Sequence, residues 1–250
     1  MDLYFPDHNL AIEFCGSYWH SELYKDVKYH YNKWKMCNEA GIQLLTFWDL
    51  EFNSREEQII SFIKSKVKKY ETIMYARQLI FKEITEKQYE FFENNHIQGG
   101  KCNIDRNFGL YTKSGILVGC VSFSKHHRNA DLYTLNRLAF KRGVNVVGGV
   151  GKLLKNALEL INKQVITWSD NRYSTGEIYT KNGFEFSEDL KPDYSYFDSK
   201  NNVILSKQSQ QKKLIGCPKD MTEHEFCKSL GRYRLWDCGK KRFVYTPKII

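Results

Sequence analysis

The sequence predicts an α/β (α+β) fold with a small first domain, a second, mixed-sheet domain and a basic C-terminal extension. Three observations support this class. Short apolar segments alternate with amphipathic segments of helical period along the 250 residues. A glycine-rich loop over 148–151 leads directly into one of the helical segments. The charge is uneven, because residues 199–250 carry 12 lysines and arginines against 4 acidic residues, whereas residues 1–72 carry 9 against 11.

The first domain, residues 1–72, is predicted to be a small α/β layer. Its apolar runs predict strands, and its first helix should end at Gly41, since glycine commonly follows a helix C-terminus. A second helix should begin at Ser54, a favourable N-cap that is followed by acidic residues, with lysines in the last turn. The predicted strands span 3–5, 10–14 and 42–48, and the predicted helices span 29–40 and 54–70.

The second domain is predicted to span 73–198, with residues 199–250 as an extension that packs on it or continues it. Turn residues between apolar runs predict a hairpin in this domain, then a strand, the glycine loop with its helix, and a further strand. A helix within 175–186 should end at Gly183. In the extension, Thr222 with a glutamate three residues later predicts a capping box. Residues 233–246 are predicted to form a closing hairpin.

Composition limits the class of protein and its compartment. Hydrophobic residues make up 42% of the chain and aromatic residues 15%, as in folded domains. No apolar run approaches the ~20 residues of a membrane span, and the first residues have no signal-like pattern. The seven cysteines form no CxxC pair, which favours free thiols. We therefore expect a cytoplasmic protein with no membrane partner.

The basic extension suggests a polyanionic partner. Residues 199–250 hold 12 basic and 4 acidic side chains and so supply 8 of the 9 net positive charges. Lysines and arginines that meet phosphates release bound counterions, so such a segment is typical of nucleic-acid-binding proteins. A solubilising tail without a partner is the alternative. The oligomeric state is left open.

One carboxylate stands inside the first buried strand. Burying an unpaired Glu13 would cost several kcal/mol or force the group to take up a proton. A hairpin would bring Asp2 beside it, and two carboxylates with waters form the usual shell of Mg²⁺. His20 lies just past the strand and could move a proton. The pattern predicts a magnesium site for phosphodiester hydrolysis, with ordinary surface or packing roles as the alternative.

The stretches "DLYFPDHNLAIEFCGSYWHSE" and "YHYNKWKMCNEAGIQLLTFWDLEF" resemble the Vsr-like nuclease domains of phage homing endonucleases, in the PD-(D/E)XK superfamily. The resemblance covers about residues 1–65, as a truncated Vsr-like, restriction-endonuclease-type domain. It implies an Mg²⁺-dependent endonuclease that acts on double-stranded DNA in the cytoplasm of a bacterial host. The residues at the family's functional positions are Asp2, Glu13, His20, His30 and Lys33. Asp2 and Glu13 would bind the metal, and His20 would serve the attacking water.

The stretch "NVVGGVGKLLKNAL" places three glycines at the start of a helix. Backbone N–H groups there bind phosphate, although tight packing also explains such loops. With the following strand and "EIYTKNGF", the order of elements over about 76–197 resembles the GNAT acyltransferase fold. The resemblance implies acetyl-CoA pyrophosphate at the loop and a tyrosine facing the thiol, although Asn145 or Val146 replaces the family's Gln/Arg. The implied cofactor-binding residues are Val147, Gly149, Gly151, Lys152 and Tyr179. A core aromatic is the alternative for Tyr179.

Three functions remain open from the sequence. The leading hypothesis is a homing-type DNA endonuclease, whose first domain cuts and whose basic GNAT-like domain binds DNA. The alternatives are an acyl-CoA-dependent GNAT-type transferase with a relic nuclease segment, and a DNA-binding protein without catalysis. Mg²⁺ is ranked above acetyl-CoA as the cofactor, because no general base is evident before the glycine loop.

Overall fold

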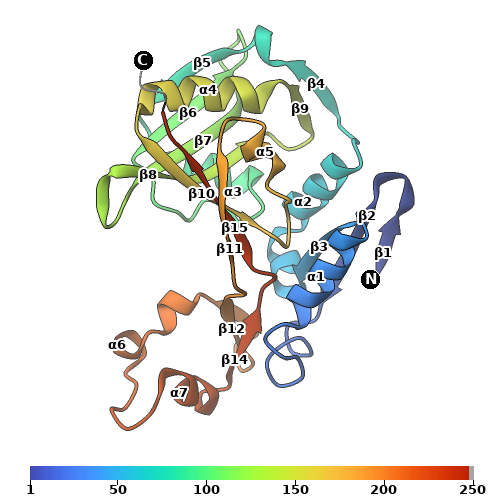
Figure 1. Cartoon of the computed structure of the whole chain (residues 1–250), viewed down its shortest axis with the longest axis vertical. Coiled ribbons are helices and arrows are strands. Elements are labelled where there is room, and N and C mark those ends of the chain that lie inside the picture. The colour runs from blue at the N-terminus through green and yellow to red at the C-terminus, as the bar shows by residue number, and fades with distance from the viewer. Residues whose placement is uncertain (248–250) are drawn as a thin grey trace. The chain divides into compact units, whose positions relative to one another are not determined.

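The computed structural model describes residues 1–247, apart from the side chain of Ala130, and it divides into two compact units. Unit 1 comprises residues 1–56, 170–175 and 189–240. Unit 2 comprises residues 57–169, 176–188 and the described residues from 241 on. Strands and helices are combined in both units, and unit 2 contains a large mixed sheet (Figure 1). The predicted α/β class is confirmed in this coarse form.

The first sheet of unit 1 is formed near the N-terminus. Its elements are β1 (Leu3–Phe5), β2 (Leu10–Cys15), α1 (Tyr29–Glu39) and β3 (Gln43–Trp48), with a 3-10 turn (Pro6–His8) between the first two strands. β2 lies in the centre, antiparallel to β1 and parallel to β3, so α1 is the crossover between two parallel strands. Nearly every residue of β2 is buried, and Ala11 of β2 packs with Cys37 of α1 and Leu44 of β3. The predicted hairpin, helix and third strand are confirmed.

The next helix differs from its prediction. α2 (Asp49–Lys66) begins at Asp49 rather than at Ser54. The side chain of Ser54 donates to the carbonyl of Glu51 at 3.0 Å instead of capping a helix start. Next to the predicted helix start at Ser54, α2 has a kink instead, because Arg55 has non-helical angles of φ −142° and ψ 33°.

The second sheet of unit 1 uses strands from the C-terminal part of the chain. Its elements are β12 (Tyr194–Asp198), β13 (Val203–Leu205), a 3-10 turn (Lys207–Gln210), α6 (Lys212–Ile215), α7 (Glu223–Ser229) and β14 (Arg232–Trp236). The capping box of Thr222 and Glu225 is confirmed at the start of α7. The Glu22 amide donates to the Arg234 carbonyl at 2.8 Å, so distant parts of the sequence complete one unit.

Unit 2 is organised around a seven-stranded mixed sheet. In spatial order the strands are β11 (Glu185–Leu190), β15 (Lys240–Tyr245), β10 (Gln164–Asp170), β8 (Asn129–Phe140), β7 (Leu117–His126), β6 (Arg106–Tyr111) and β5 (Ile80–Ile84). β5 to β8 form an antiparallel meander, whereas β10 is parallel to β8. A parallel neighbour needs a crossover connection, and α4 supplies it.

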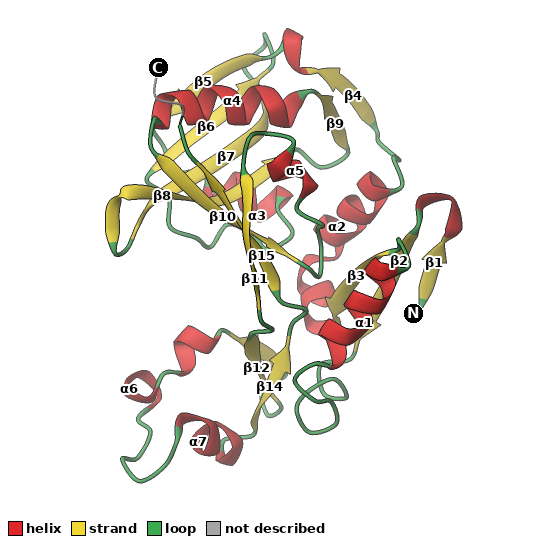
Figure 2. Ribbon diagram, viewed as in Figure 1, coloured by secondary structure: helices red, strands yellow, loops and turns green. Residues whose placement is uncertain are grey.

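Helices cover both faces of this sheet. The helices are α3 (Tyr89–Asn95), α4 (Gly149–Ile161) and α5 (Glu177–Thr180); a short parallel pair, β4 (Thr72–Tyr75) and β9 (Val144–Val147), and a 3-10 turn (Ala76–Gln78) complete the unit. Figure 2 shows α4 lying across the sheet, where its leucines pack with Phe108 and Val121. α3 packs with Cys120, the neighbour of Val121 that points to the other face. No helix within residues 1–247 is both long and apolar enough to cross a membrane.

One longer-range expectation is wrong. Residues 233–246 do not form a hairpin, because β14 pairs with β12 while β15 lies between β11 and β10 in the larger sheet. The compact units also differ from the predicted segments 1–72, 73–198 and 199–250, since the strands of 189–240 belong to unit 1. The helix expected within 175–186 is only the single turn of α5.

Candidate functional site

The buried carboxylate of unit 1 has a partner on the next helix. Glu13 is 6% exposed on β2, and the Lys33 ammonium of α1 lies 2.5 Å from its Oε2. Burial opposes the charge on Lys33, but the hydrogen bond and charge of Glu13 outweigh it and raise the pKa of Lys33. Lys33 therefore compensates the charge of the Glu13 carboxylate in this structure.

Asp2 lies beside Glu13 across the β1–β2 hairpin, as the sequence predicts. Its backbone amide donates to the Ile12 carbonyl at 3.0 Å, and its Oδ2 accepts the Phe14 amide at 2.8 Å. The Asp2 carboxylate thus holds the end of the hairpin. Metal binding by Asp2 and Glu13 stays a prediction.

His20 and His30 lie together, although ten positions separate them in the sequence. His20 Nδ1 and His30 Nε2 are 3.4 Å apart, and the Trp48 ring packs edge-on against His30 at 4.9 Å. Burial lowers the pKa of His20; burial and the neighbouring His20 lower that of His30 to about 3. Both rings are therefore neutral at pH 7 and can offer a nitrogen lone pair.

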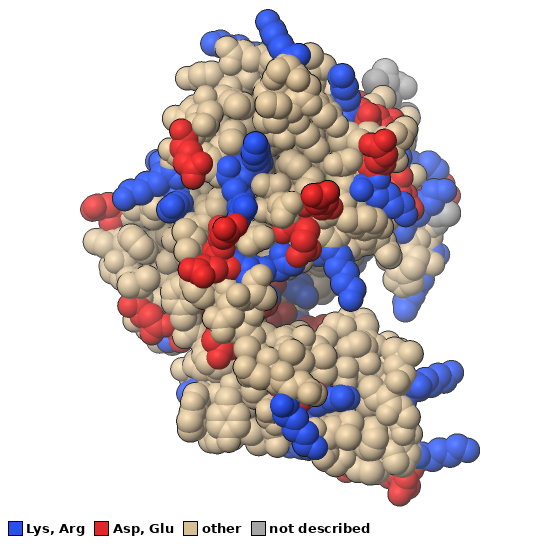
Figure 3. Space-filling model, turned by 180° about the vertical axis from the view of Figure 1, so that it is seen from behind, with Lys and Arg blue, Asp and Glu red and all other residues tan. Residues whose placement is uncertain are grey.

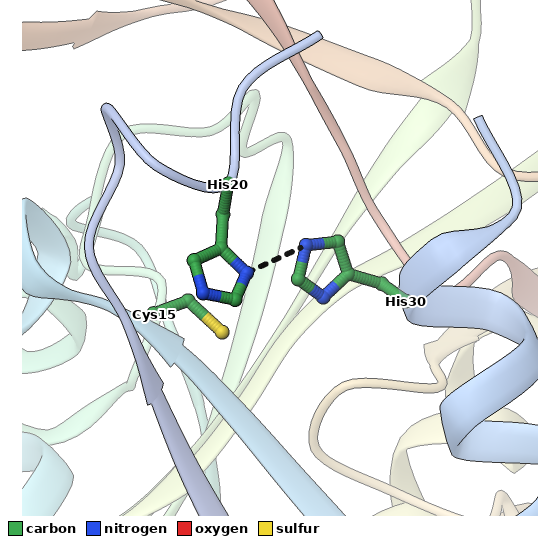
Figure 4. Close-up of side chains that lie close together, drawn as sticks. All are labelled: Cys15, His20 and His30. Carbon is green, nitrogen blue, oxygen red and sulfur yellow. Dashed lines mark hydrogen bonds between the residues drawn. The ribbon is translucent and has the colours of Figure 1, made fainter. Parts of the chain in front are cut away.

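Cys15 completes this cluster, and the sequence interpretation treated it only as a free thiol. It follows Glu13 by two positions on β2, so both side chains leave the same face of the strand. One ligand atom each from Cys15, His20 and His30 lies within 4.8 Å of the others (Figure 4). Burial, followed by the charge of Glu13, raises the pKa of the Cys15 thiol. The alternation along β2 was the only signal that could have linked this cysteine to the site.

A second candidate site lies in unit 2, where two parallel strands part. β8 and β10 pair only from Leu132 to Thr134 on β8, although both strands continue beyond these residues. The ladder between β8 and β7 passes from Leu135 to Arg137, which leaves Asn136 as an extra residue in a bulge. The bulge bends β8 where its pairing with β10 stops, and the side chain of Thr167 bridges to the Leu135 carbonyl at 3.3 Å.

We call the point at which β8 and β10 part the fork. The glycine loop begins α4 next to it. Gly148 is the N-cap, with a φ of 73° that suits glycine. A Cβ on Gly149 would lie 2.8 Å from Phe140 and Val146, whereas one on Gly151 would meet nothing closer than Asn182 at 3.5 Å. Gly149 is therefore required for close packing, whereas a side chain at Gly151 would make only ordinary contacts.

The remaining predicted cofactor residues lie around the same helix end. Val147 is 47% exposed on β9. Lys152 donates from Nζ to the carbonyls of Ala76 and Leu79 at 3.1 and 2.6 Å, so its ammonium fixes a neighbouring segment. The Tyr179 hydroxyl bonds with the side chain of Thr167, and burial raises the pKa of Tyr179. Tyr179 thus reaches the point at which β8 and β10 part.

The surface that would meet the predicted DNA partner carries both positive and negative side chains. On the face drawn in Figure 3, lysines and arginines lie among acidic side chains rather than in one continuous basic area. Several basic side chains of the extension also form ion pairs with carboxylates. These basic side chains are Lys207, Arg232, Lys240 and Arg242. Double-stranded DNA as a partner stays a prediction.

Comparisons with known proteins give structural likenesses only. No protein-family model matches the chain, and no curated protein matches it. Among solved structures, the N-acetyltransferase YhbS from Escherichia coli in complex with CoA is 15% identical, with 43% of this chain and 69% of that chain covered and a TM-score of 0.36. A Bacillus subtilis acetyltransferase in complex with CoA is 12% identical, with coverage of 68% and 99% and a TM-score of 0.36.

A third likeness is to the spermidine/spermine N-acetyltransferase SpeG from Vibrio cholerae, in complex with manganese ions. It is 12% identical, with 68% of this chain and 92% of that chain covered and a TM-score of 0.39. Identities and TM-scores of this size do not assign the chain to a family.

The predicted resemblance to Vsr-like homing endonucleases is corrected by these results. The likenesses are to acetyltransferases and not to nucleases. The Mg²⁺-dependent endonuclease, the leading hypothesis from the sequence, was therefore wrong, and nothing in the comparisons supports Mg²⁺ as the cofactor. The prediction rested on the buried Glu13, whose negative charge suggested a bound metal ion. In the structure this carboxylate forms an ion pair with Lys33.

Proposed function

We propose that unit 2 is an acyl-CoA-dependent acyltransferase with a GNAT-like fold, which transfers an acyl group to an amine. The observation that carries the proposal is the fork between β8 and β10 beside the N-terminus of α4. Ligands of open α/β sheets bind where neighbouring strands leave a crevice at their carboxyl ends. The crossover helix between these two strands begins at that same end.

The fork suits the two halves of an acyl-CoA. Beyond Thr134, β8 has no ladder to β10. The Leu135 and Asn136 carbonyls there accept the side chains of Thr167 and Arg137, and the second lone pair of each could accept an amide of a pantetheine arm, as in strand addition. The first N–H groups of α4 have no helical acceptor and attract phosphate. Gly151 has no side chain to block the approach to them, and its nearest neighbour is the Asn182 side chain, 3.5 Å from the position of a Cβ.

Tyr179 supports the chemistry of transfer. The neutral amine nitrogen attacks the thioester carbonyl carbon, the C–S bond breaks, and the sulfur leaves with the bonding electrons. The proton that the amine nitrogen loses on forming the amide goes to solvent water. The Tyr179 phenol, held at Thr167 beside the fork, would give its proton to the sulfur. Burial raises the pKa of Tyr179, so the phenol keeps its proton until the developing thiolate takes it.

The acceptor amine has a pocket next to the bulge. The pocket has a volume of about 710 Å³ and is lined by Tyr89, Glu90, Glu93, Asn94, Gly100, Lys101 and Cys102. Arg137, next to the bulged Asn136, donates to the carbonyls of Gly99 and Lys101, which fixes the pocket loop to the strand. Two glutamates against one lysine leave the lining with a net negative charge, which favours a cationic acceptor.

Isothermal titration of the full-length protein with acetyl-CoA tests this function. We expect one-to-one binding in the micromolar range and a matching rise in melting temperature by mass action. Gly151→Asp should abolish binding, because its carboxylate would repel the phosphates at the helix start. Gly151→Ala should keep it, and Leu160→Asp, with the same charge change at the exposed end of α4, should also keep it.

The transfer step has its own readout. Tyr179→Phe should retain acetyl-CoA binding and lower the rate of thiol release with a polyamine acceptor by about 10²–10⁴-fold. Absence of acetyl-CoA binding in the native protein would refute the proposed function. Equal binding by Gly151→Asp and the native protein would refute the placement of the phosphates.

A further inference from the structure

We infer that unit 1 contains a Zn²⁺-type transition-metal site formed by Cys15, His20 and His30. This site is separate from the proposed acyl-CoA site and uses none of its residues. It also differs from the Mg²⁺ site predicted at Asp2 and Glu13, because its donors are sulfur and nitrogen. Thiolate and imidazole suit Zn²⁺, whereas Mg²⁺ prefers oxygen ligands.

The distances within the cluster fit coordination. His20 Nδ1 and His30 Nε2 are 3.4 Å apart, which is long for a direct N–H···N hydrogen bond. Two imidazole nitrogens at the usual ~2.0–2.1 Å from a tetrahedral Zn²⁺ stand about 3.3 Å apart. The Cys15 sulfur completes a set whose ligand atoms are all within 4.8 Å of one another. Figure 4 shows the three side chains converging on one point.

Each ligand is held by an ordered element. Cys15 ends β2, where it lies opposite Trp48 of β3. His20 closes a tight turn by donating its amide to the Gly16 carbonyl at 3.0 Å. His30 lies in the first turn of α1, and its carbonyl accepts the Cys238 thiol at 3.5 Å. A ligand set held in this way needs little reorganisation to bind an ion.

The surroundings tolerate the added charge. The Glu13–Lys33 ion pair next to the cluster is neutral overall, so it does not oppose a cation as a lone lysine would. Arg172, whose charge also acts on His30, pairs with Glu51 and Asp170, whereas Lys25 opposes a cation here. His20 is only half-buried, whereas Cys15 and His30 are buried, so the cluster has an open side. Three protein ligands with an open side leave a fourth position for water or an exogenous ligand.

Titration of the full-length, metal-free protein with Co²⁺ tests this site, because Co²⁺ takes the place of Zn²⁺ and absorbs light. We expect saturation at one ion per chain, visible d–d bands of a tetrahedral ion and a thiolate-to-cobalt charge-transfer band. Added Zn²⁺ should displace Co²⁺ and remove the bands, whereas excess Mg²⁺ should leave them unchanged. Failure to observe the charge-transfer band in the native protein would overturn the inference.

Variants assign the ligands. Cys15→Ser should remove the charge-transfer band, and His20→Ala should weaken binding by more than about 100-fold, beyond the effect of a supporting residue. Cys217→Ser and His8→Ala change residues of the same unit outside the cluster. They should leave the charge-transfer band and the Co²⁺ affinity unchanged. Circular dichroism of each metal-free variant checks folding. Cys15 is buried, so Cys15→Ser could unfold the protein. His20 is only half-buried, so His20→Ala should stay folded and still test the site. Unchanged affinity in folded His20→Ala would refute its role as a ligand.

Discussion

Alanine substitutions at two glycines of one loop are predicted to change stability in opposite directions. At Gly149 the new Cβ would lie 2.8 Å from the Phe140 ring and 2.8 Å from Val146 Cβ. Val146 cannot turn its Cβ away, so α4 or β9 must shift, and overpacking of this kind costs about 1–3 kcal/mol. At Gly151 the new Cβ makes only ordinary contacts, and exchanging a helical glycine for alanine stabilises by about 0.5–1 kcal/mol.

Thermal unfolding followed by circular dichroism measures both effects. For a chain of this length, 1 kcal/mol corresponds to about 2–4 °C in melting temperature. Gly149→Ala should therefore melt about 2–12 °C lower than the native protein, and Gly151→Ala about 1–4 °C higher. The two variants share the same chemical change, so each is the control for the other. A melting temperature for Gly149→Ala equal to or above the native value would refute the packing argument.

Three further measurements follow. Lys33→Met leaves Glu13 buried without its partner and should lower the free energy of unfolding, measured in urea, by about 2–3 kcal/mol. This is less than the loss for a fully buried pair, because the Lys33 side chain is 30% exposed. The double variant Lys33→Met with Glu13→Gln should recover most of this loss. The Arg106 hydrogen bond lowers the pKa of Glu83 below 4.5, so this pair stabilises above pH 4.5 and the contribution is lost as pH falls through the folded pKa. Glu83→Gln should cost about 0.5–1 kcal/mol at pH 7 and nothing at pH 2. If residues 199–250 contact DNA, the affinity for a duplex should fall with salt by a log–log slope of about 0.9 per phosphate contact, and a flat dependence would remove DNA as a partner.

Local signals in the sequence predicted local structure. The hairpin before Glu13, the helix ending before Gly41 and the capping box at Thr222 each depend on residues within one turn or one strand. The stability of each of these features depends on residues close by in the sequence. A short stretch of sequence is therefore enough to predict them. The glycine loop belongs to the same group, since the helix it predicted begins at Gly149.

Pairing at long range could not be predicted in this way. The residues of β14 and β15 both favour strands, but nothing local states that they enter different sheets. The same limit applied to the site: Glu13 indicated a need for positive charge, and either a metal or Lys33 would meet it. Cys15, His20 and His30 follow no metal-binding spacing, and only the fold of β2 and α1 brings them together.

The interleaved composition of unit 1 has a consequence for its synthesis on the ribosome. Glu22 bonds to Arg234 across 212 positions of sequence. At about 5–20 residues per second, Arg234 leaves the ribosome roughly 10–40 s after Glu22. During that time β1, β2 and β3 lack the strands of 189–240, and their apolar surface has no cover from them. The nascent chain therefore passes through a long-lived, incomplete state in which holding by a chaperone would raise the yield of folded protein.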